Sequence, residues 1–198
     1  MSKEYIQLDY KAKRVLNSML PIGWSGLVKS TPLGGFYDTE YKIDGMMKTP
    51  YTGDYIFLYD VKTNKTHQDS MTFTTKDQNL VSWKDKNKAD LYIFVFQEKR
   101  IAFFLSLSRL EKLLDGLCPM KSIKNPSEFV WLSLGQIERQ SLLILQDSKF
   151  SLPGGESSED SIRMIWNTLS VEIHNERNQI KNLDLDNIFR SLVPISSL

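Results

Sequence analysis

The segment GDYIFLYDVKTNKTHQDSMTFTT, residues 53–75, decides how the chain is expected to fold. It contains an apolar, aromatic run, then a polar turn, then a second run rich in threonine and other β-prone residues. Runs of this kind bounded by turn-forming residues are typical of strands. We therefore predict a long strand over 54–63 and a shorter one over 70–75, paired in an antiparallel meander.

The long strand ends in Asp60-Val61-Lys62. Residues two apart on a strand project from the same face, so Asp60 and Lys62 form an adjacent acid and base at the end of a buried strand. A salt bridge at the rim of a sheet explains this pair without any chemistry. A catalytic role requires a second acid nearby.

Helices and strands are expected on both sides of this segment. Residues 3–20 place apolar residues at helical spacing, with Lys11, Lys13 and Arg14 on a basic outer side. FYDTEYKI, residues 36–43, alternates as a strand does. The charged connector 76–88 can hold a short helix, and ADLYIFVFQEKRIAFFLSL reads as a hairpin turned at QEKR.

The second half of the chain adds helices. FLSLSRLEKLL (104–114) and WLSLGQIERQSLL (131–143) each combine a strand end, a capping serine and an amphipathic helix. Ser157 or Ser158 can cap a further helix, and 183–193 can form a last short one. These elements predict an α/β (α+β) fold with a mixed central sheet and C-terminal helices, in a single domain spanning 1–198.

The composition excludes several classes of protein. The chain has 198 residues, 41% hydrophobic and 25% charged, with a net charge of +1, so it is expected to fold without carrying a strong electrostatic field. It contains no apolar run of the roughly 20 residues that cross a bilayer. The one cysteine, Cys118, excludes an internal disulfide and is expected to be a buried structural thiol. We expect a cytoplasmic protein without a signal peptide or membrane contact.

A second acid is expected across the sheet from Asp60. Asp38 opens its predicted strand, and a reversal of the chain after residue 43 would bring Asp38 and Asp60 together. Two neighbouring carboxylates resist joint ionisation unless a cation lies between them. Oxygen ligands without cysteine or histidine favour Mg²⁺ or Mn²⁺. Lys62 could then orient a water or stabilise charge on a phosphate.

Two other acids precede the triplet. Asp54 lies too near Asp60 on the same strand to be its cross-strand partner. Asp44 stands before Gly45, and Asp-Gly is a strong turn signal, so Asp44 is expected to cap a turn. Asp38 is therefore the preferred second acid.

Asp38, a strand, and then Asp60-Val61-Lys62 resemble the PD-(D/E)xK nuclease superfamily, in its small phage and bacterial type. The later segments MTFTT and KADLYIFVF add to the resemblance, which covers residues 1–97. It implies a restriction-endonuclease-like core of a helix, a three-stranded meander, a helix and a further strand. It also implies Mg²⁺-dependent hydrolysis of phosphodiester bonds in DNA, with Asp38 and Asp60 as metal ligands and Lys62 acting on the water. Residues 98–198 would complete the core.

Further residues are candidates for supporting roles. Possible auxiliary groups at the metal or the phosphate are Glu4, Asp44, Thr63 and Gln78. Side chains that could contact the nucleic acid are Lys65, Lys76, Trp83 and Lys84, although a solvated, charged connector is the preferred account of the lysines.

Two other kinds of function stay open from the sequence. The same scaffold could be a non-catalytic nucleic-acid-binding or protein-interaction module in which Asp60 and Lys62 form only a salt bridge. It could also be a structural subunit of a larger complex. By analogy with nucleases that cut both strands, a homodimer is a further expectation.

Overall fold

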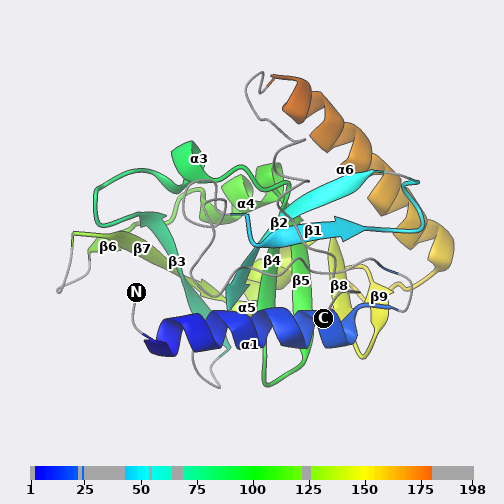
Figure 1. Cartoon of the computed structure of the whole chain (residues 1–198), viewed down its shortest axis with the longest axis horizontal. Helices are drawn as coiled ribbons and strands as arrows, with labels where there is room; N and C mark the ends of the chain where they lie inside the picture. Colours follow the sequence, from blue (N-terminus) through cyan, green and yellow to red (C-terminus); the bar gives the residue numbers. More distant parts are fainter. Residues whose placement is uncertain are drawn as a thin grey trace.

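The structure is a computed structural model that describes residues 3–21, 24, 43–53, 55–63, 69–121 and 126–179 (Figure 1). It contains a mixed six-stranded sheet, a small three-stranded sheet and helices, which confirms the predicted α+β class. In chain order the elements are α1 (Lys3–Met19), β1 (Gly45–Lys48), β2 (Ile56–Thr63), β3 (Ser70–Lys76), α3 (Trp83–Lys86), β4 (Leu91–Phe96), β5 (Ile101–Ser106), α4 (Leu107–Leu114), β6 (Met120–Lys121), β7 (Glu128–Ser133), α5 (Leu134–Gln140), β8 (Leu143–Gln146), β9 (Lys149–Ser151) and α6 (Glu159–Gln179).

The large sheet has the strand order β1-β2-β4-β5-β8-β9. Its neighbours are antiparallel except β2 and β4, which run parallel. Parallel strands need a crossover connection, and here β3 and α3 lie within that crossover. The strands from the second half of the chain thus extend the same sheet that contains β2.

The predicted antiparallel pairing of strands 54–63 and 70–75 is wrong. Both strands exist, as β2 and β3, but β2 lies between β1 and β4, while β3 pairs with β7 in the small sheet. The physical reason lies in their burial. β2 is buried at five successive residues and needs cover on both faces, whereas β3 alternates between buried and exposed positions, as a strand with one solvated face does. The strand predicted over 36–43 lies outside the described residues, except for Ile43, which precedes β1.

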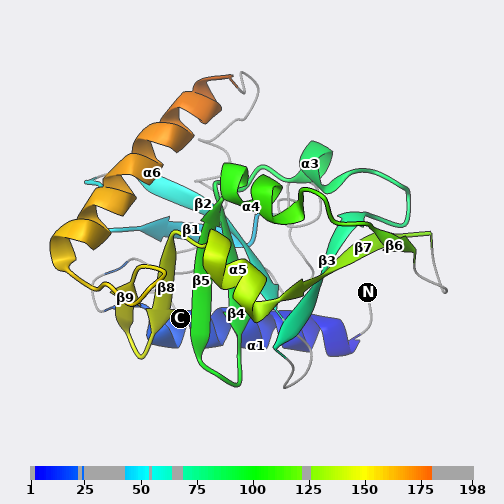
Figure 2. The same ribbon diagram turned by 180° about the vertical axis from the view of Figure 1, so that it is seen from behind.

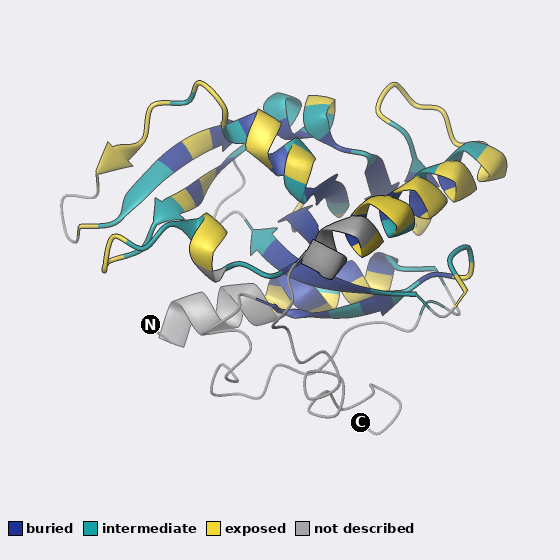
Figure 3. Cartoon of the chain, turned by 90° about the horizontal axis from the view of Figure 1, so that it is seen from above, coloured by how far each residue is buried: buried dark blue, intermediate teal, exposed yellow. Residues whose placement is uncertain are grey.

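Apolar side chains pack against both faces of the large sheet. Helix α1 lies across one face and α5 across the other (Figures 1 and 2). One cluster joins α1 and α6 to the sheet and includes the fully buried Trp166. The other joins α4, α5 and the small sheet to the opposite face, around Phe94 and Phe103. Figure 3 shows buried strands and exposed residues on the outer sides of the helices. All six residues of β4 are buried because both of its faces are covered.

Several local predictions are confirmed. The first helix is α1, the connector holds α3, and the turn at QEKR joins β4 to β5. Ser106 and Ser133 cap α4 and α5, each accepting a hydrogen bond from a backbone N–H three residues on. The Ser158 hydroxyl accepts a bond of 3.2 Å from the Ser161 N–H at the start of α6. The helix predicted over 183–193 lies outside the described residues.

Two side chains contradict the sequence prediction. Lys13, expected on the outer side of the first helix, is only 6% exposed. Spacing sorts residues by hydrophobicity and does not reveal that a buried carboxylate, that of Asp44, is its partner. Cys118, expected to be buried, is exposed, because it lies where the chain leaves α4 and turns toward β6. No described helix has the length and apolar character needed to cross a membrane.

Gly45 provides a test of the packing that holds β1 against β2. It lies opposite Tyr59, and a Cβ atom added there would come 2.5 Å from the Tyr59 Cζ atom. We expect Gly45→Ala to lower the free energy of unfolding by about 1–3 kcal/mol, because the tyrosine ring must move within a packed core. Urea denaturation measures this loss. Gly135→Ala in α5, where the nearest atom would be 3.7 Å away, is the control. Equal stability of the two variants would contradict the prediction.

Candidate functional site

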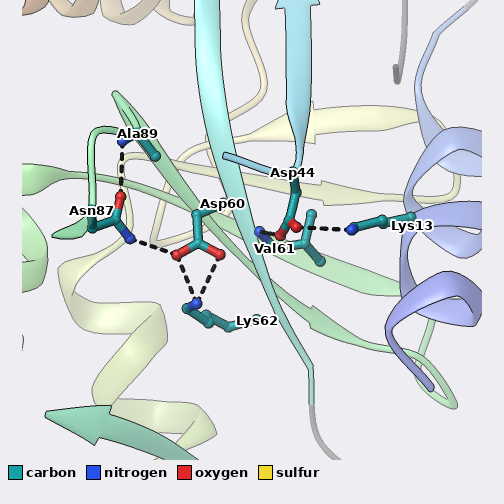
Figure 4. Close-up of polar contacts among 7 residues, drawn as sticks. All are labelled: Lys13, Asp44, Asp60, Val61, Lys62, Asn87 and Ala89. Atoms are coloured by element: carbon teal, nitrogen blue, oxygen red, sulfur yellow. Dashed lines mark hydrogen bonds and ion pairs between the residues drawn. The ribbon is translucent and has the colours of Figure 1, made fainter. Parts of the chain in front are cut away.

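Two acids and a lysine, Asp44, Asp60 and Lys62, lie where β1 and β2 run side by side. Asp44 immediately precedes β1, and Gly45 lies opposite Tyr59, so the pairing sets Asp44 beside Asp60. The Asp44 N–H donates to the Tyr59 carbonyl at 2.8 Å. The Asp44 carboxylate also bonds to β2, because its Oδ2 accepts the Val61 N–H at 2.7 Å (Figure 4).

The Lys62 ammonium forms a salt bridge with the Asp60 carboxylate. Its Nζ atom is 2.7 Å from Oδ1 and 2.6 Å from Oδ2. The Asp60 side chain is 4% exposed, whereas that of Lys62 is 30% exposed. The pair therefore joins a buried acid to a cation that still reaches solvent, on the same face of β2, as the spacing predicts.

Asn87 is a site residue that the sequence analysis missed. Its Nδ2 donates to Asp60 Oδ2 at 2.6 Å, and its Oδ1 accepts the Ala89 N–H at 2.8 Å, which orients the amide (Figure 4). Asn87 follows α3 and precedes β4, the strand beside β2. The sequence signal for Asn87 is a polar residue just before a buried strand. That signal points to Asp60 only when β4 is known to adjoin β2.

Lys13 is the second missed residue. Its Nζ lies 2.8 Å from Asp44 Oδ1, and the two side chains are 7% and 6% exposed. Helix α1 thus supplies a cation to the end of β1. Two adjacent acids, Asp44 and Asp60, are thus flanked by two lysines, so each buried carboxylate has one ammonium partner.

The environment raises the pKa of Asp60 from 3.8 to about 7. Burial is the largest cause, because it disfavours the charged form. The Lys62 ammonium lowers the pKa, while the neighbouring Asp44 carboxylate raises it through repulsion and a side-chain hydrogen bond. Asp60 therefore exchanges a proton near neutral pH, and a cation placed beside both acids would favour its ionised form.

The remaining predicted residues are only partly brought together. Asp38 and Lys65 lie outside the described residues, and Glu4 is on α1 but its side chain is not described. The prediction that Asp44 caps a turn is wrong, because its carboxylate contacts β2 and α1 instead. Thr63 projects to the face opposite Lys62 and donates to the Val95 carbonyl at 3.2 Å.

The other candidates lie on the connector and its flanks. Gln78 is exposed in the turn after β3. Lys76 pairs with Glu128 at 3.0 Å, and Lys84 pairs with Glu111 at 2.8 Å. Surface ion pairs of this kind account for both lysines without a nucleic acid. Trp83 is half-buried and lines a cavity next to Lys62.

The side chains here that could hold a hard divalent cation are few. Among the described residues no three Asp, Glu, His or Cys side chains gather in a metal-binding group. Asp44 and Asp60 supply two carboxylates. The Val61 carbonyl lies on the same strand edge as its N–H, because both main-chain groups of a strand residue face the same neighbour. Mg²⁺ is commonly held by one or two carboxylates while keeping several waters.

Comparison with protein-family models, curated proteins and solved structures gave no match. The class that the coordinates define is a mixed α/β protein with a buried, charge-compensated acid pair at the ends of two adjoining strands.

Proposed function

We propose that this protein is a metal-dependent endonuclease that hydrolyses phosphodiester bonds in DNA, on a PD-(D/E)xK-type core. The observation that carries the proposal is the convergence of Asp44 and Asp60 from adjoining strands, with the Lys62 ammonium on Asp60. We assign the first acid to Asp44 in place of Asp38, because Asp44 immediately precedes the strand that pairs with β2.

The order of elements supports the same proposal. The resemblance implies a helix, a three-stranded meander, a second helix and a further strand; β1 and β2 form an antiparallel pair, whereas β3 pairs with β7 instead of completing the meander. Among the described elements, α1, the antiparallel pair β1 and β2, α3 and β4 follow in that order, with β3 inserted into the crossover. The parallel pairing of β2 with β4 brings Asn87 to Asp60.

Each side chain of the site has a defined task in this proposal. Asp44, Asp60 and the Val61 carbonyl would hold Mg²⁺ or Mn²⁺. When bound, such a cation stabilises negative charge on the phosphate and makes its water more acidic. Lys62, at the solvent side of Asp60, positions the attacking water or a phosphate oxygen. Asn87 and Lys13 are positioning residues that orient Asp60 and Asp44.

The test is metal-dependent cleavage of supercoiled and linear DNA by the full chain. We expect nicking or linearisation in Mg²⁺ or Mn²⁺ and none in EDTA. Lys62→Met is expected to lower the rate about 10²- to 10⁴-fold, the range for losing a group that acts on a reacting proton. Lys149→Met is the control, because Lys149 is exposed on β9, at the opposite edge of the large sheet from β1. A wild type inert on DNA and RNA with every metal, or a fully active Lys62→Met variant, would refute the assignment.

One observation favours a second candidate function. Both carboxylates already have an ammonium partner, Lys13 on Asp44 and Lys62 on Asp60, so the network is electrically compensated as it stands. A non-catalytic binding module with a structural ion-pair network would have this arrangement. The same experiment separates the two functions, because a module of this kind would bind DNA or another protein and leave phosphodiester bonds intact.

A further inference from the structure

A cavity of about 130 Å³ opens next to the acid pair. Its lining comes from the end of β2, from β3, and from the loop and short helix that follow β3. Among the lining residues are Lys62, Phe73, Thr74, Val81, Trp83 and Asn87. Lys62 and Asn87 also contact the Asp60 carboxylate. A molecule in this cavity would therefore lie beside the groups assigned to the reaction.

The apolar part of the cavity is aromatic and held in one orientation. The Trp83 ring packs edge-on against Phe73, with centroids 5.4 Å apart at 86°, and against Tyr92, at 5.9 Å and 89°. Such edge-to-face contacts are favourable and fix the plane of the ring. The Lys62 Nζ lies 5.9 Å from the centroid of Phe73. The cavity is thus lined by both aromatic rings and an ammonium group.

The loop at the rim is also held in one conformation. The Asp77 carboxylate accepts the N–H groups of Asn79 at 2.8 Å and Val81 at 3.0 Å, and the Asp77 N–H donates to the Val81 carbonyl at 3.1 Å. Leu80 sits in the left-handed region, with φ of 59°, and its side chain is 56% exposed. A non-glycine residue keeps that conformation only where its surroundings enforce it. These bonds hold the loop that carries Asp77 and Val81, two residues that line the cavity.

Size and chemistry together indicate the ligand. A cavity of roughly 150 Å³ accommodates one benzene ring, so a space of this volume suits a single six-membered ring better than a fused pair. Aromatic side chains stack on nucleobases with little regard to sequence. The amide of Asn87 and the ammonium of Lys62 supply donors for ring oxygens or a phosphate. A pyrimidine base has the ring size, the aromatic faces and the ring oxygens that match this cavity.

We propose that this cavity binds one pyrimidine-sized base of the strand being cut, stacked on Trp83 and next to the scissile phosphate. The inference rests on the proposed nuclease function. The base leaves its stack to enter, which costs least in single-stranded or frayed DNA. Substrates with an unpaired pyrimidine beside the cleaved bond are accordingly preferred.

Fluorescence titration tests the proposal. The full chain is titrated in Ca²⁺ or EDTA with short oligomers of thymidylate, of deoxyadenylate, and of abasic sugar-phosphate. We expect tightest binding of the thymidylate oligomer and a change in tryptophan emission that Trp83→Phe removes. Trp83→Ala weakens the binding of oligothymidylate roughly 5- to 100-fold, the range for losing one stacked base. Trp131→Ala, which truncates a 49% exposed tryptophan on β7, leaves affinity unchanged.

The outcomes separate this proposal from the nuclease assignment. If the wild type cleaves DNA but Trp83→Ala and Trp83→Phe keep its affinity and KM, the cavity is not the base site. Equal affinity for the three oligomers would also show that the cavity is not the base site. If oligothymidylate binds through Trp83 but no metal supports cleavage, the base site stands and the nuclease assignment fails. Circular dichroism confirms that each variant is folded, and Trp83→Phe, which keeps an aromatic ring, covers the case in which Trp83→Ala does not fold.

Discussion

Asp60→Asn is expected to reduce metal-dependent DNA cleavage more than about 10³-fold, because it removes a proposed metal ligand and the charge that Lys62 pairs with. The substitution keeps the size of the side chain and one oxygen for the Asn87 amide. The variant is therefore expected to fold and to bind DNA at least as tightly as the wild type, with one negative charge fewer. Plasmid cleavage and filter binding measure the two effects. A variant that cleaves within tenfold of the wild-type rate would exclude Asp60 as a ligand.

The same variant gives a signature in stability that depends on pH. The pKa of Asp60 is about 7 in the folded protein against 3.8 in the unfolded chain, so the folded state binds the proton more tightly. This contribution to stability is complete below pH 3.8 and is lost as the pH rises to about 7. Asp60→Asn has no such proton. Its stability relative to the wild type is therefore expected to rise between pH 4 and pH 7, by at most about 4 kcal/mol at roughly 1.4 kcal/mol per unit of pKa shift.

Urea denaturation in EDTA, compared at pH 4, 5.5, 7 and 8, measures this difference. The groups that face Asp60 are Lys62, Asp44 and Asn87, and Lys13 lies behind Asp44. They are present in both proteins, so their direct contributions largely cancel in the comparison. A difference that stays constant from pH 4 to pH 8 would show that Asp60 has an ordinary pKa.

Lys13→Met is expected to lower the free energy of unfolding by about 3–5 kcal/mol, since it leaves the buried Asp44 carboxylate without its cation. The thermal midpoint is then expected to fall by roughly 10 °C for a chain of this size. Methionine keeps the length of the side chain, so the loss reports the charge and not a cavity. Calorimetry or thermal denaturation at pH 7 measures the shift.

Lys11→Met is the matched control. Lys11 lies on the same helix two residues earlier and is exposed, so its substitution is expected to change stability by less than about 0.5 kcal/mol. The double variant Lys13→Met/Asp44→Asn is expected to recover part of the loss, because the uncompensated charge is gone. If Lys13→Met is no less stable than Lys11→Met, the ion pair on Asp44 does not hold the site together.

The sequence predicted the elements better than their partners. β2, β4 and β5 are recognisable from their apolar runs, and the serines at 106, 133 and 158 mark helix starts by a local mechanism. The partner of β3 was wrong because strand pairing depends on which faces need cover, and that is decided by segments far away in the chain. Cys118 was wrong for a related reason, since apolar neighbours in sequence do not place a turn inside the core.

The sequence by itself determined the mixed α/β class and the Asp60–Lys62 pair, because alternation along one strand places side chains two apart on one face. Only the tertiary structure decided what surrounds that pair. Asp44 comes from the preceding strand, Lys13 from the first helix and Asn87 from the crossover before β4, at separations of 16 to 47 residues from Asp60. Such contacts depend on strand order and register, which long-range packing sets and which no local pattern of residues encodes.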